Sequence, residues 1–146
     1  MGNIVAIHIA PTAGAAPVPV DIAVLRKGAG IDGDRYSKNI GTYSHWPSDH
    51  ELTLIEQAVV NDLGLKPGES RRNITVDGIA LNPLVGQRFR LGRVLCEGTR
   101  LCEPCAYLER HLERPGIVRQ LIGRGGLRAL VLENGEIRVG DAITLE

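Results

Sequence analysis

The stretch Leu127–Leu145, LRALVLENGEIRVGDAITL, alternates apolar and polar residues in two runs. Alternation with a period of two predicts strands that are buried on one face. Asn134 and Gly135 stand between the runs, and this dipeptide favours the type I′ turn of a two-residue hairpin. We therefore predict a β-hairpin at this end of the chain.

The same alternation recurs upstream and sets the expected fold class. Further strands are predicted in NIVAIHIA, in the run after Asp21, in RNITV from Arg72, and across QRFRLGRVLCEGTRL. Many short strands with one or two helices are typical of a barrel. We expect a mainly β, barrel-like single domain that covers residues 1–146.

Two segments carry helical patterns. In residues 45–68, Ile55, Val59 and Leu63 fall with Ala58 on one helical face before Gly64. The start of this helix has two alternatives. Ser48 and Glu51 match a capping box, but LTLI is also typical of a short strand, in which case the helix begins near Glu56. A second helical insert is predicted over residues 106–126, broken at Pro115.

Composition excludes several classes of partner. Lys plus Arg and Asp plus Glu number 17 each in 146 residues, so no net charge attracts nucleic acid or an anionic membrane. No apolar run approaches the roughly 20 residues that span a bilayer, and the N-terminus lacks the basic region of a signal peptide. We expect a cytoplasmic protein with neither nucleic-acid nor membrane partners.

The three cysteines offer several chemistries. Cys102 and Cys105 form a C-x-x-C around a proline, a spacing shared by zinc sites and dithiol redox sites. Structural zinc would need Cys96 or the four scattered histidines as further ligands, and dithiol exchange usually needs a doubly wound fold. Cys105 precedes a helix and follows Arg100, which favours a thiolate. Cys102 is a second reactive thiol or a packed one, and Cys96 is expected to be a buried apolar residue.

Arginine outnumbers lysine by fourteen to three, and guanidinium groups suit the forked recognition of anions. Arg71, Arg72 and Asn73 stand at a turn into a strand, where they could hold a phosphate. Arg88 and Arg90 flank Phe89 and are expected on a solvated strand face. The turn with Asp32 and Asp34 could handle a proton or a metal, or simply cap its own backbone.

Taken in order, several motifs resemble the MOSC domain, the C-terminal domain of molybdenum-cofactor sulfurase. The most specific are the turn SRRN-x-T-V-x-G, the P-C step at Cys105 and the closing G-x-I-x-x-GD-x-I hairpin. In this family Tyr36 is often replaced by His. The stretches are GIDGDRY, ELTLIEQAVVNDLGL, SRRNITVDGIALNPLVGQRFRLG, GTRLCEPC and GGLRALVLENGEIRVGDAITL.

This resemblance implies a strongly bent β-barrel and a use for Cys105. The equivalent cysteine is a sulfur carrier or, in the reductase branch, a ligand of molybdenum in a pterin cofactor. By the same comparison Arg71, Arg72 and Asn73 become contacts of the pterin phosphate. Arg100 belongs to the same cofactor-binding set, with Cys102 beside the reactive cysteine.

Three functions follow as expectations. The first is a molybdenum-cofactor-dependent oxidoreductase that reduces N-hydroxylated or N-oxygenated small molecules, with electrons from a separate donor protein. The second is a sulfur carrier that receives a Cys105 persulfide from a cysteine desulfurase. The third is a non-enzymatic anion-binding module. Pyridoxal phosphate is not expected in this chain.

Overall fold

The computed structural model describes residues 2–10, 16–34, 51–102 and 123–146. In these ranges the chain is mainly β, with one short α-helix. The elements are β1 (Gly2–Ile9), β2 (Val18–Val20), β3 (Ile22–Arg26), β4 (Gly30–Ile31), β5 (Leu52–Glu56), α1 (Gln57–Asp62), β6 (Ile74–Asp77), the 3-10 turn η1 (Asn82–Leu84), β7 (Arg88–Leu91), β8 (Val94–Leu101), β9 (Leu127–Val131), β10 (Gly135–Arg138) and β11 (Ala142–Leu145).

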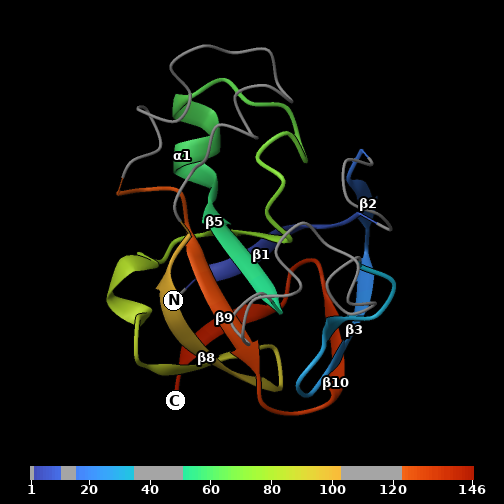
Figure 1. The fold of residues 1–146 in the computed structure, drawn as a ribbon. Coiled ribbons are helices and arrows are strands. Elements are labelled where there is room, and N and C mark those ends of the chain that lie inside the picture. The colour runs from blue at the N-terminus through green and yellow to red at the C-terminus, as the bar shows by residue number, and fades with distance from the viewer. Residues whose placement is uncertain (1, 11–15, 35–50, 103–122) are drawn as a thin grey trace.

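Seven strands close into a barrel. Their order is β11-β7-β8-β9-β5-β6-β1, and β1 pairs back with β11, while β2 extends the sheet beyond β1 (Figure 1). A closed barrel with an odd number of strands must contain a parallel pair, and here it is β5 with β6. Parallel neighbours need a crossover, which α1 and the chain up to residue 73 provide. The predicted mainly β, barrel-like single domain is confirmed.

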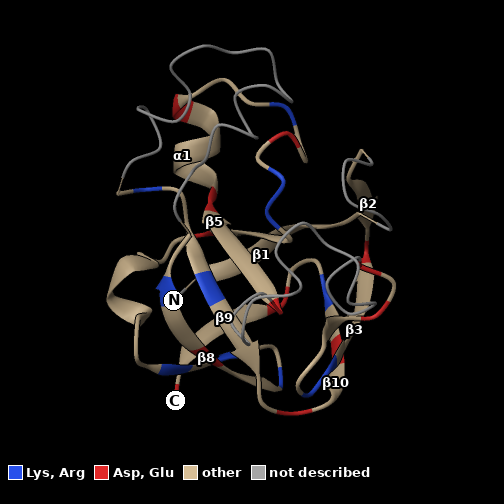
Figure 2. Cartoon of the chain, viewed as in Figure 1, with Lys and Arg blue, Asp and Glu red and all other residues tan. Residues whose placement is uncertain are grey.

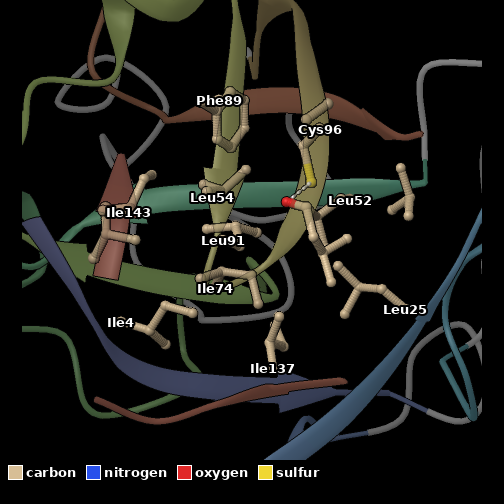
Figure 3. Packing of buried hydrophobic residues seen from close by; sticks show 14 of the residues in the cluster. Ile4, Leu25, Leu52, Leu54, Ile74, Phe89, Leu91, Cys96, Ile137 and Ile143 are labelled. Atoms are coloured by element: carbon tan, nitrogen blue, oxygen red, sulfur yellow. Dashed lines mark hydrogen bonds between the residues drawn. The ribbon is translucent and has the colours of Figure 1, made fainter. Parts of the chain in front are cut away.

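The barrel interior is filled by alternating residues of its strands. Phe89 is fully buried between Arg88 and Arg90, whose side chains lie outside, so the predicted solvated face of β7 is confirmed. However, β7 is not an edge strand, because it pairs with both β8 and β11. Figure 3 shows this core, which includes Ile4, Leu25, Leu52, Leu54, Ile74, Phe89, Leu91, Cys96, Ile137 and Ile143.

The segment before Gly64 divides between a strand and a helix. LTLI belongs to β5, and α1 begins only at Gln57, so the later of the two predicted helix starts is correct. A helix beginning near Ser48 is excluded, because β5 has barrel partners on both sides. Val59 and Leu63 pack with Ile55 in a second, smaller core, as predicted. However, Ile55 belongs to β5 rather than to the helix, and Ala58, predicted on the same face, is exposed.

The predicted hairpin at Asn134-Gly135 is wrong. Both edges of β9 are occupied, by β8 and β5, so β10 cannot pair with it and joins β3 instead. The Oδ1 atom of Asn134 accepts a hydrogen bond from the backbone N–H of Lys27 at 2.7 Å, which fixes the passage between the two sheets. The closing hairpin implied by the resemblance is also absent, since β11 pairs with β7 and β1.

Two further sequence expectations concern a second helix and a membrane span. The helical insert over residues 106–126 lies mostly outside the described residues. Within the described ranges, no helix is long and apolar enough to cross a membrane.

Candidate functional site

Asn73 joins three strands at the start of β6. Its Oδ1 atom accepts hydrogen bonds from the backbone N–H and the hydroxyl of Thr53 in β5, both at 3.1 Å. Its Nδ2 atom donates to the carbonyl oxygen of His8 in β1 at 3.2 Å. Because the Asn73 amide is occupied in this way, it fixes the backbone that follows Arg71 and Arg72. A phosphate contact by Asn73 itself stays a prediction.

Arg71 has an unusual backbone conformation. Its φ is +60°, and it is the single non-glycine residue with positive φ in the described part of the chain. The left-handed region costs an L-residue roughly 1–2 kcal/mol relative to glycine, and such strain is concentrated at functional sites. The residue is also buried, at 8% exposed. We infer that the sequence keeps an arginine here for its side chain.

This inference gives a first prediction. Arg71→Gly and Arg71→Ala both remove the side chain, but only the glycine variant relieves the left-handed strain. We expect Arg71→Gly to be more stable to urea than Arg71→Ala by about 1 kcal/mol, although both lose the guanidinium. Equal unfolding midpoints for the two variants would show that the backbone at residue 71 is not strained.

Arg72 is a buried cation with backbone partners. It is 9% exposed, its Nε atom donates to the carbonyl oxygen of Gly125 at 2.9 Å, and its Nη1 atom donates to that of Ser70 at 3.1 Å. The Nη2 atom is buried and makes no hydrogen bond. No carboxylate in the described ranges forms an ion pair with Arg72. Buried charges are normally paired, so this guanidinium is suited to an anionic ligand.

Cys102 and Gly126 form what we call the neck, the point where the chain leaves β8 and returns before β9. The backbone N–H of Cys102 donates to the carbonyl oxygen of Gly126 at 2.7 Å. The Cys102 thiol forms no disulfide and is buried, which agrees with the alternative that Cys102 is a packed residue. Arg72 contacts Gly125, the neighbour of Gly126, and thus connects the arginine turn to the neck.

Cys105 lies outside the described residues. Three peptide bonds join it to Cys102, so the two Cα atoms can be at most about 11 Å apart. The neck therefore anchors the start of the segment that carries Cys105. A reactive role for Cys105 stays a prediction.

The other arginines of this region lie on the outer barrel face. Arg100 of β8 stands directly opposite Arg128 of β9, and Arg128 stands opposite Thr53 of β5. Like charges directly opposite each other in a sheet are destabilising. Figure 2 shows basic residues on β9 and along the chain that leads into β6. Arg124 forms an ion pair with Asp62 at 2.6 Å.

Cys96 takes no part in this region. It is fully buried in the barrel core, and its Sγ atom lies 3.8 Å from the carbonyl oxygen of Val94. Burial, with smaller contributions from the negative charges of Glu51 and Glu133, raises the pKa of the Cys96 thiol to about 12. The thiol stays protonated at neutral pH, so the predicted structural role is confirmed.

The zinc alternative gains no support from the described histidine and cysteine residues. Across those ranges, no group of three or more His, Cys, Asp or Glu could hold a metal ion. Tyr36 and the remaining candidate ligands lie outside the described residues; these are Cys105, His45, His50 and His111.

The acidic turn has a different role from a local cap. Asp34 is fully buried, and its Oδ1 atom accepts a hydrogen bond from the backbone N–H of Ala10 at 2.9 Å. Asp32 is exposed and pairs with Arg26 at 3.2 Å. The sequence offered no signal for the Ala10 contact, because the two residues are 24 positions apart. The sequence also did not predict the contacts of Thr53, Gly125 and the end of β1 with the arginine turn, because these residues are distant from it in sequence.

Comparison with known proteins places this geometry in a family. A model of the MOSC domain matches residues 38–144, which is more than half of the chain. The chain belongs to the MOSC domain family. No curated protein sequence matches this MOSC domain.

Crystal structures of other proteins share the fold of this chain. The YuaD protein from Bacillus subtilis has a TM-score of 0.78 and 20% sequence identity over 98% of this chain and 94% of that one. YiiM from Geobacillus stearothermophilus has a TM-score of 0.77 and 17% identity, covering 100% and 75%. YiiM from Escherichia coli has a TM-score of 0.71 and 18% identity, covering 99% and 69%. At these identities the similarity shows the fold alone.

The residues of this MOSC domain fit the phosphate end of a pterin cofactor. Arg72 supplies a buried positive charge and one buried N–H that lacks an acceptor. A phosphate oxygen is the kind of acceptor that satisfies both. Cys105 would supply the sulfur ligand, and a thiolate suits molybdenum as a soft ligand.

Proposed function

We propose that this MOSC domain binds the molybdenum cofactor and reduces N-hydroxylated or N-oxygenated small molecules. Cys105 is the molybdenum ligand, and Arg71 and Arg72 hold the cofactor phosphate. One observation carries the proposal: the 2.9 Å hydrogen bond from Arg72 Nε to Gly125 O, which joins the arginine turn to the neck of the Cys105 segment. The two features are distant in sequence.

Burial of Arg72 strengthens its interaction with a bound phosphate. A charge-assisted hydrogen bond is stronger where water is excluded, so Arg72 binds a phosphate more firmly than a surface arginine does. Its two backbone hydrogen bonds also hold the guanidinium plane in one orientation. The arginine turn therefore serves as an anchor that orients the bound group relative to the neck.

The cofactor, when bound, supplies oxo transfer between molybdenum and the substrate. In the net reaction the N–O bond of an N-hydroxylated substrate breaks, and the oxygen leaves as water after uptake of two protons and two electrons. The electrons come from a separate electron-donor protein. The chain itself binds the cofactor, supplies Cys105 as the sulfur ligand, and accepts the substrate.

Metal content tests this proposal. The protein, purified from cells that make the cofactor, is expected to hold close to one molybdenum per chain, and Cys105→Ala at least about tenfold less, because the ligand bond is lost. Cys96→Ala is the matched control, since that thiol is sealed in the core and its loss should leave the metal in place. The measurement is elemental analysis together with pterin fluorescence.

Other outcomes assign the other functions. Sub-stoichiometric molybdenum that Cys105→Ala does not change would contradict cofactor binding. One added sulfur atom at Cys105, found by mass spectrometry after incubation with a desulfurase and cysteine, would instead support the sulfur carrier. Phosphate binding by a metal-free protein whose Cys105→Ser variant is fully functional in cells would support the anion-binding module.

A further inference from the structure

His8 is attached to the arginine turn through its backbone. Its N–H donates to the carbonyl oxygen of Asn73 at 2.7 Å, and its own carbonyl oxygen accepts from the Asn73 amide at 3.2 Å. The side chain is buried, at 3% exposed. The position of the imidazole is therefore fixed relative to the residue that follows Arg72.

The ring also packs against the chain that leads into the turn. A Cβ atom at Gly68 would lie 3.0 Å from Cδ2 and 3.3 Å from Nε2 of His8, so the absence of a side chain at Gly68 makes room for the ring. The carbonyl oxygen of Gly68 in turn accepts a hydrogen bond from the N–H of Arg71 at 3.0 Å. His8 thus contacts both ends of residues 68–73, the short segment that carries Arg71 and Arg72.

Among the buried polar atoms at this segment, two that belong to different parts of the chain have no hydrogen-bond partner in the described residues. They are Nδ1 of His8 and Nη2 of Arg72. Folded proteins leave few buried polar atoms without partners, because each such atom costs free energy on folding. Because His8 contacts Gly68 and Asn73, and Arg72 lies between those two residues in sequence, one bound ligand can satisfy both atoms.

The two atoms offer complementary chemistry. Burial lowers the pKa of His8, so its ring is neutral at pH 7 and contributes a hydrogen bond without charge. Arg72 contributes the charge, since a guanidinium stays protonated. In the tautomer with the proton on Nδ1, both groups are donors, and a phosphate with several acceptor oxygens can satisfy both.

We propose that His8 Nδ1 and Arg72 Nη2 donate hydrogen bonds to the same phosphate group, which makes His8 a further binding residue of the site. This inference rests on the proposed function, which places a phosphate at the turn. Arg72 attracts the phosphate by its charge, and the hydrogen bond from His8 orients the bound phosphate. It also ties occupancy of the site to the end of β1.

Nuclear magnetic resonance of the metal-free protein tests this inference. Histidine-¹⁵N-labelled protein is titrated with inorganic phosphate, and with chloride at matched ionic strength. We expect the His8 Nδ1 resonance to shift with phosphate to saturation and to stay in place with chloride. His8→Leu should weaken phosphate binding about tenfold, the value of one hydrogen bond. His8→Asn, whose amide nitrogen lies near the position of Nδ1, should restore most of the affinity.

The outcomes separate this inference from its alternatives. If phosphate does not shift the His8 Nδ1 resonance, the inference is overturned. The partner of Nδ1 is then an internal water only. Folded His8→Leu protein with wild-type affinity would overturn it too. Should His8→Leu fail to fold, the wild-type titration and the His8→Asn affinity still decide. Cys105→Ala should keep full phosphate affinity, so loss of molybdenum binding and loss of the phosphate contact remain distinguishable.

Discussion

Gly126→Ala is expected to lower the free energy of unfolding by about 3 kcal/mol or more. Gly126 has a φ of +105°, a conformation that an L-residue adopts only with strain. A Cβ atom at this position would also fall on the carbonyl oxygen of Leu54, a backbone atom that cannot rotate away. Because β5 is paired on both sides, with β9 and β6, the chain cannot relax without disturbing the neck at Cys102.

Gly123→Ala provides the matched control for this prediction. Gly123 also has positive φ, +76°, but a Cβ atom there would meet nothing within 4 Å. It should therefore show only the left-handed strain, about 1 kcal/mol. Urea unfolding followed by circular dichroism measures both variants. Equal losses for the two alanines would mean that the contact between Gly126 and β5 contributes nothing to stability.

Arg72→Met should have the second large effect, on both stability and binding. Methionine fills a similar volume but leaves the carbonyl oxygens of Ser70 and Gly125 without their donors. Each lost partner of a buried group costs about 1–3 kcal/mol, partly offset by burial of the apolar side chain. The anchor between the arginine turn and the neck is lost as well. We expect molybdenum content to fall at least about tenfold even where the protein folds.

Arg88→Met is the control for Arg72→Met. The Arg88 side chain is 59% exposed and pairs with Glu97 at 3.5 Å on the barrel surface. Surface ion pairs of this kind contribute little, so the change should stay within about 0.5 kcal/mol and leave molybdenum content unchanged. Thermal unfolding and elemental analysis of both variants make the comparison. An Arg72→Met protein as stable and as rich in metal as Arg88→Met would contradict the role assigned to Arg72.

Much of the barrel follows from local patterns. Alternation around Phe89 places its ring inside and Arg88 and Arg90 outside, since successive strand residues point to opposite faces. The same alternation predicted a hairpin at Asn134-Gly135, where it failed. A turn signal is local, whereas strand pairing depends on which edges are free, and β8 and β5 already occupy both edges of β9.

Part of the candidate site can also be predicted from the sequence, and part of it cannot. The motif from Ser70 to Asn73 and the Cys102–Cys105 pair can be found in the sequence, because each is defined by residue types at a short, fixed spacing. Their proximity cannot be found there, since Arg72 and Gly125 are 53 residues apart. Nor does the sequence distinguish Asn73, whose amide holds three strands together, from a ligand-binding residue.

By itself, the sequence determined the strand pattern, the late start of α1 as one of two alternatives, and the residue types available for binding an anion. These depend on side-chain periodicity and on intrinsic chemistry, which act over a few residues. Only the tertiary structure decided the pairing of β10 with β3, the burial of Arg72 and the contact of the arginine turn with the neck. Closure of the barrel decides these features, because it sets which strand edges are free and which distant residues meet.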